Sequence, residues 1–183
     1  SLLRKTRREL HRSAVTLIEA QGNNNGHAEP KVVDSIERLA FHALKGEMWE
    51  SAARYARQAG VHAFERGSNP EAVAAFKEAI AACEYLPQDH AQLQSAIDLR
   101  LALRSALLPL GDFAQTLAVV REAEQLATAL GDHQRLAQAT FFLSLHLYLN
   151  GQHDEAVRAA QRAQALTAGR DPIMHALATY LTG

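Results

Sequence analysis

Apolar residues recur at roughly every third or fourth position along most of the chain, with polar residues between them, as in amphipathic helices. Gly67, Gly111 and Gly151 interrupt this pattern, and each ends one periodic stretch and precedes another. A glycine in such a place supplies the left-handed conformation that closes a helix C-terminus. From these breaks we expect helices over the following approximate ranges: 2–20, 31–46, 48–66, 70–85, 88–109, 112–130, 132–149 and 152–168, with a last one at 171–182.

The spacing of the three glycines indicates a repeated unit. They are separated by 44 and 40 residues, within the range of periods typical of stacked helix pairs. In the predicted helix 152–168, Ala156, Ala160 and Ala163 form a stripe of small residues that lets a neighbouring helix approach closely. Such pairs bury a continuous core only when they stack, so we expect an all-α array. Four carboxylates stand at predicted helix starts as capping candidates: Asp89, Asp112, Asp132 and Asp154.

The segment QGNNNGHAEP, residues 21–30, contains no apolar anchor and is predicted to be a mobile loop. It would separate an N-terminal basic helix, residues 1–20, from helical repeats over residues 31–183. The sequence starts at Ser1 rather than Met, so we expect a fragment of a larger protein, with the 1–20 helix as the end of a preceding domain.

Charge limits the classes of partner. The net charge of −1 and pI near 6.7 create no overall attraction to polyanions, so we do not expect nucleic-acid or membrane binding. The first helix nevertheless carries a basic cluster: Arg4, Lys5, Arg7, Arg8, His11 and Arg12. Contact with phosphate or an acidic partner is one interpretation. A solvated helix face is the other, and we favour it because no aromatic residues are interleaved for base stacking.

No apolar run approaches the roughly 18 residues that span a bilayer, and we identify no signal peptide. With the single Cys83, expected to be an inert buried thiol, this predicts a cytoplasmic location. The nine histidines lack metal-binding spacing, and the sequence contains no nucleophile elbow and no Gly-rich phosphate loop. We therefore expect no metal, no cofactor and no enzymatic activity.

Around the repeated glycines the chain resembles the tetratricopeptide repeat. The best match comprises Thr140, Leu143, Ser144, Leu147, Gly151, Ala156, Ala160 and Ala163. A looser match comprises Leu103, Leu107, Gly111, Phe113, Thr116, Val120 and Ala123, with Arg104 where a small residue is usual. The resemblance implies a right-handed superhelix of antiparallel helix pairs, a tetratricopeptide-like α-solenoid that binds proteins or peptides.

In tetratricopeptide arrays the first helix of each pair lines a concave groove. Carried over to this chain, that register implies six partner-binding candidates: Arg54, Arg57, Leu101, Phe141, Leu145 and Tyr148. The Lys and Asn set with which some members hold a C-terminal carboxylate is missing, because Leu101 and Phe141 stand at one of its positions. Two interpretations of Phe141, Leu145 and Tyr148 stay open: they contact a ligand, or the final helix or a second copy covers them.

A second resemblance concerns context. Residues 2–20, 37–60, 69–80 and 97–108 are similar to the region that follows the nucleotide-binding and winged-helix domains of large bacterial signalling ATPases and adenylate cyclases. It implies a non-catalytic interaction and regulatory module inside such a protein, whose partners are other domains of the parent chain or a second copy. The alternative is a sensor domain that binds a peptide or small molecule in its groove and controls a neighbouring ATPase or cyclase domain.

Overall fold

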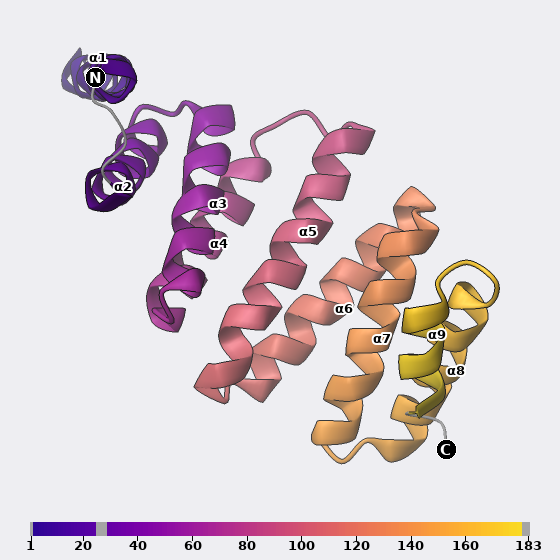
Figure 1. The fold of residues 1–183 in the computed structure, drawn as a ribbon. Coiled ribbons are helices and arrows are strands. Elements are labelled where there is room, and N and C mark those ends of the chain that lie inside the picture. Colours follow the sequence, from indigo (N-terminus) through magenta and orange to yellow (C-terminus); the bar gives the residue numbers. More distant parts are fainter. Residues whose placement is uncertain (1, 25–28, 181–183) are drawn as a thin grey trace. The chain divides into compact units, whose positions relative to one another are not determined.

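The computed structural model describes residues 2–24 and 29–180 of the 183-residue chain (Figure 1). Over these residues the secondary structure is helical, and no strand occurs in them. The helices are α1 (Leu2–Asn24), α2 (Glu29–Lys45), α3 (Trp49–Glu65), α4 (Asn69–Cys83), α5 (His90–Leu107), α6 (Phe113–Leu130), α7 (His133–Leu149), α8 (His153–Thr167) and α9 (Pro172–Tyr180), with a short 3₁₀ turn η1 (Leu108–Leu110) after α5. The all-α prediction is confirmed.

The predicted helix boundaries agree with the observed ones to within a few residues, except around the predicted loop 21–30. There α1 continues to Asn24 and α2 begins at Glu29, and the remainder of that loop, residues 25–28, lies outside the described residues. The glycine breaks at Gly67, Gly111 and Gly151 all adopt the left-handed conformation, with φ between 72° and 76°. These joints therefore close their helices as the sequence predicts.

Three of the four capping carboxylates also behave as predicted. Asp89, Asp112 and Asp132 each accept a hydrogen bond from the backbone N–H three residues later, at 2.8 to 3.0 Å. The prediction for Asp154 is wrong, because α8 begins at His153 and its N-cap is Gln152. Asp154 lies instead in the first turn, where a negative charge still interacts favourably with the helix dipole.

The chain divides into two compact units, residues 1–87 and 88–183, and each is described by itself. In unit 1, helices α1 to α4 pack consecutively, each against the next. Their interfaces are built mainly from alanines, including Ala52, Ala59 and Ala72, which are almost fully buried. Gly60 on α3 lies against the ring of Phe76 on α4, so this pair of helices approaches closely at a residue without a side chain.

In unit 2, helices α5 to α9 also pack in chain order. One core cluster joins α5, α6 and α7, and comprises Ile97, Leu101, Ala123, Ala127 and Ala139. A second cluster joins α6, α7 and α8, and comprises Val120, Leu143, Leu147, Ala156 and Ala159. Helices α6 and α7 thus each contribute alanines to the first cluster and larger residues to the second, which is how stacked helix pairs share a continuous core.

Candidate functional site

The two predicted contact residues of unit 1 lie exposed on α3. The Nη2 atom of Arg54 donates a 2.9 Å hydrogen bond to the Tyr55 hydroxyl, and its guanidinium lies 4.6 Å from the centre of the Tyr55 ring. Tyr55 in turn donates to Glu19 of α1. Arg54 therefore takes part in a side-chain network that joins α3 to α1, whereas Arg57 is exposed and no contact of its side chain is described.

The predicted residues of α7 form a graded row on one side of the helix. Phe141 and Leu145 are half-buried, whereas Tyr148 is 57% exposed and the adjacent Leu149 is also exposed. The Tyr148 ring meets the ring of His153 edge-on, with 5.1 Å between the ring centres. We call these four residues, Phe141, Leu145, Tyr148 and Leu149, the α7 row.

The prediction for Leu101 needs correction. Its side chain is only 7% exposed and lies in the core cluster with Ile97 and Ala139, so it is not available to a partner. The reason is geometric: at this point α5 is covered by both α6 and α7, and an apolar residue facing them is drawn into the core.

The sequence did not predict a polar contact inside unit 2. Arg104 of α5 is 9% exposed, and its Nε atom donates a 3.0 Å hydrogen bond to Nε2 of His146 on α7. Its guanidinium also lies 3.9 Å from the centre of the Phe142 ring, a cation–π contact. Burial and the neighbouring Arg104 charge lower the pKa of His146 to about 4, so the imidazole is neutral near pH 7 and accepts this hydrogen bond.

A second polar contact joins the same two helices near the start of α7. Arg135 pairs with both carboxylate oxygens of Asp98 on α5, at 2.7 and 2.8 Å, and with Asp132 at 2.8 Å. Burial acts to raise the pKa of Asp132, but the hydrogen bonds from Arg135 and Gln94 outweigh it and lower that pKa to about 2. Each of the three charges has an opposite charge beside it, so this network positions α5 against α7 and is a structural contact.

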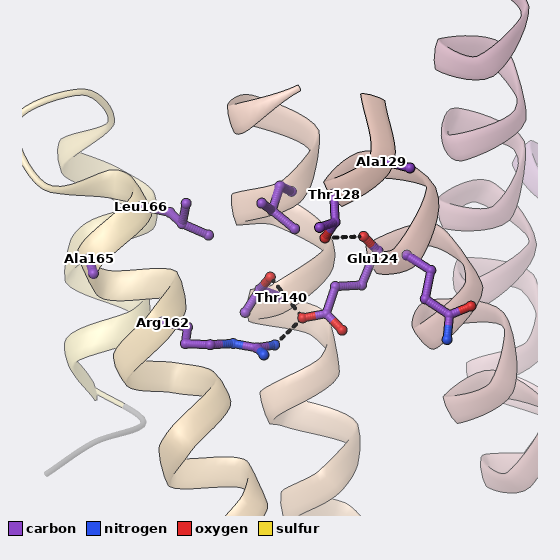
Figure 2. Close-up of a pocket in the computed structure, with 9 residues that line it drawn as sticks. Glu124, Thr128, Ala129, Thr140, Arg162, Ala165 and Leu166 are labelled. Carbon is purple, nitrogen blue, oxygen red and sulfur yellow. Dashed lines mark hydrogen bonds and ion pairs between the residues drawn. The ribbon is translucent and has the colours of Figure 1, made fainter. Parts of the chain in front are cut away.

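An open groove of about 670 Å³ lies between α6 and α8, with α7 behind it (Figure 2). Its lining includes apolar side chains of α7 and α8, among them Leu136 and Leu166. On the polar side, the Glu124 carboxylate accepts from Arg162 of α8 and from the Thr140 hydroxyl of α7. The groove is therefore apolar with an internally paired charge, and the tetratricopeptide register did not point to it because it is lined mainly by second helices.

The described residues offer no metal site, since they contain no group of three or more His, Cys, Asp or Glu side chains that could hold a metal ion. No helix in this part of the chain is long and apolar enough to cross a bilayer. Cys83 is buried, as predicted.

The comparisons with known proteins bear on the fold. No protein-family model matches the chain, and neither does any curated protein. The crystal structure of nearly identical TPR-like repeats from a Podosopora anserina protein described as a putative kinesin light chain matches with a TM-score of 0.53 and 16% identity, covering 93% of this chain and 94% of that one. A variant of those repeats, in which methionine replaces one glutamine, matches with a TM-score of 0.52 and 16% identity, covering 91% and 92%. The chain thus has a TPR-like helical-repeat fold, as the resemblance to the tetratricopeptide repeat implies.

Proposed function

We propose that this chain is a non-catalytic interaction and regulatory module that binds a protein or peptide through the α7 row. The observation that carries the proposal is the gradient of exposure along this row. Phe141 and Leu145 are held half-buried by the fold, and they lead to Tyr148 and Leu149, which project into solvent. An exposed aromatic and an exposed aliphatic side chain next to half-buried apolar residues are typical of a contact surface.

We further propose that the module works inside a larger bacterial signalling ATPase, in the cytoplasm, where its partner is another domain of the parent or a second copy. The resemblance of residues 2–20 and 37–60 to such proteins supports this setting. So does α1, on which Leu3, Leu10 and Leu17 recur every seven residues and are strongly exposed. A heptad row of this kind suits contact with another helix.

The experiment is a double substitution in the α7 row, Leu145→Ser with Tyr148→Ser. We expect it to shift self-association of the chain towards monomer in sedimentation velocity, or to abolish binding to the parent's other domains. Helicity should stay nearly unchanged, because partly exposed apolar groups contribute little to the fold.

The matched control is Phe113→Ser with Val157→Ser, two apolar residues of α6 and α8 that are exposed to a similar degree. This control should leave association and binding unchanged. If the Leu145 and Tyr148 double variant unfolds the chain instead, the row belongs to the core, and Arg54 and Arg57 become the better candidate surface.

The alternative function, a sensor for a peptide or small molecule, is favoured by one observation, the groove between α6 and α8. Its volume of about 670 Å³ falls in the range of small-molecule sites. Ala165→Phe would fill it. A compound that raises the melting temperature of the wild type but not of this variant would support the sensor, and equal responses in both would exclude the groove as its site.

A further inference from the structure

Arg104 is a buried cation with no carboxylate partner among the described residues. Two other arginines of unit 2 are neutralised by carboxylates: Arg100 pairs with Glu122 at 2.9 Å, and Arg135 pairs with Asp98 and Asp132. Arg104 is more buried than either, and burial lowers its pKa with no acidic group acting in the opposite direction. A largely desolvated charge without a counter-ion is costly, and the contacts described so far do not offset that cost.

The contacts that Arg104 does make leave its charge intact. His146 is completely buried and neutral, and it accepts the Nε–H of Arg104 at its own Nε2 atom. The Phe142 ring covers one face of the guanidinium. The hydrogen bond and the stacked ring together fix the orientation of the guanidinium plane, and neither neutralises its charge.

The two terminal nitrogens of Arg104, Nη1 and Nη2, donate to no described side chain or carbonyl. Among the described residues, two side-chain nitrogens are completely buried without a hydrogen-bond partner, Gln92 Nε2 and His146 Nδ1. The terminal nitrogens of Arg104 also lack a partner but do not belong to this group, so they are not completely buried. Nη1 and Nη2 therefore keep some contact with solvent, although Arg104 as a whole is only 9% exposed. A guanidinium that presents terminal N–H groups in one plane matches the two oxygens of a carboxylate.

We propose that Arg104 anchors a carboxylate of the bound polypeptide, either an Asp or Glu side chain or the C-terminus. This inference rests on the proposed function and gives it a chemical specificity. Leu145 lies one helical turn beyond Phe142 on α7, so the anchor stands beside the apolar α7 row. A ligand that fits both would carry a carboxylate next to an aromatic or aliphatic side chain.

The first test uses small probes on the wild-type chain. Phenylacetate, which combines a carboxylate with an aromatic ring, should bind with a measurable Kd and shift the ¹⁵Nε resonance of Arg104. In Arg104→Met the Kd should rise by about tenfold or more, because a charge-assisted pair is lost. The matched control is Arg121→Met, an exposed arginine of α6 that lies 3.8 Å from Glu155, and it should bind phenylacetate like the wild type.

Three results would overturn the inference: no binding of phenylacetate to the wild type, equal affinity in Arg104→Met, or tighter binding of inorganic phosphate than of phenylacetate. Circular dichroism of Arg104→Met shows whether this variant remains folded. Arg104→Lys is a second variant, which keeps the charge but loses the paired N–H geometry. The lysine variant should fall between the wild type and Arg104→Met.

A second pair of probes distinguishes the source of the carboxylate. Both are hexapeptides rich in Leu and Phe; one has a free C-terminus and no acidic side chain, and the other is amidated with one internal Glu. Preference for the first assigns a C-terminal carboxylate, preference for the second assigns a side chain, and loss of both in Arg104→Met supports the anchor. The Leu145→Ser, Tyr148→Ser variant separates the two proposals. If this variant binds both phenylacetate and the peptides as tightly as the wild type does, the α7 row is not part of the binding surface, and the role of Arg104 as the carboxylate anchor still stands.

Discussion

Gly60→Ala is the substitution for which helix propensity and packing predict opposite outcomes. Gly60 lies in the interior of α3, where alanine is ordinarily favoured over glycine by about 0.8–1.0 kcal/mol. A Cβ atom at this position would lie 2.7 Å from both Cδ1 and Cε1 of the Phe76 ring and 3.1 Å from its Cγ. Carbon atoms prefer separations of about 3.5–4.0 Å, so the ring or the helix must move.

The Phe76 ring has little room to give way, because it is only 2% exposed. Overpacking of this kind costs about 1–3 kcal/mol. After the gain in helix propensity is subtracted, we expect Gly60→Ala to lower the free energy of unfolding of unit 1 by about 1 kcal/mol. Trp49 is the single tryptophan of the chain and stacks on Tyr85 at 4.0 Å within unit 1, so its fluorescence in a urea titration follows this unit.

The control is the same substitution in a Phe76→Leu background. There the ring is gone, and Gly60→Ala should become neutral or stabilising by up to about 1 kcal/mol. The two changes are thus predicted to couple in a double-mutant cycle. Stabilisation of the wild type by Gly60→Ala, or an equal effect in both backgrounds, would refute a clash with Phe76.

Two further predictions test the repeat register and the buried histidine. Ala72→Leu and Ala156→Leu should each destabilise by about 1–3 kcal/mol in chemical denaturation, because both sites are buried where paired helices touch; wild-type stability in both would show the register to be wrong. Unit 2 should lose stability as the pH falls from 6.5 towards 4, since the folded-state pKa of His146 is about 4 and the unfolded chain takes up the proton first. The loss, up to about 3 kcal/mol, should be absent in His146→Leu and retained in His153→Gln, as followed by urea titrations with circular dichroism at several pH values.

Helix positions were predictable from the sequence because each depends on local signals. Gly67, Gly111 and Gly151 adopt the left-handed conformation that their place after a periodic stretch indicates, and Asp112 and Asp132 cap the helices that follow them. Both signals act within a few residues along the chain. The failure at Asp154 is of the same local kind, a shift of one or two residues in a helix start.

Side-chain exposure was less predictable, because it depends on residues far apart in the sequence. Leu101 and Phe141 occupy the same place in the tetratricopeptide register, yet Leu101 is in the core and Phe141 is half-buried. The difference comes from which helices pack over each, and a helical period identifies an apolar face without saying how deeply it is covered. In the sequence, Arg104 differs from the tetratricopeptide pattern only in being a large residue where a small one is usual. Its partner His146 lies 42 residues away, so no local signal connects the two.

The Arg104 and His146 pair also bears on what the module is for. A buried polar pair of this kind contributes less to stability than well-packed apolar side chains of similar volume would, and the surrounding clusters show that this fold readily supplies such side chains. Departures from local rules in an otherwise consistent sequence concentrate at functional positions. In unit 2 the capped starts of α5, α6 and α7 and the two apolar clusters follow those rules, and Arg104 with His146 departs from them. The departure lies beside the α7 row, so it supports our proposal of a binding surface there and extends that proposed surface from α7 to α5.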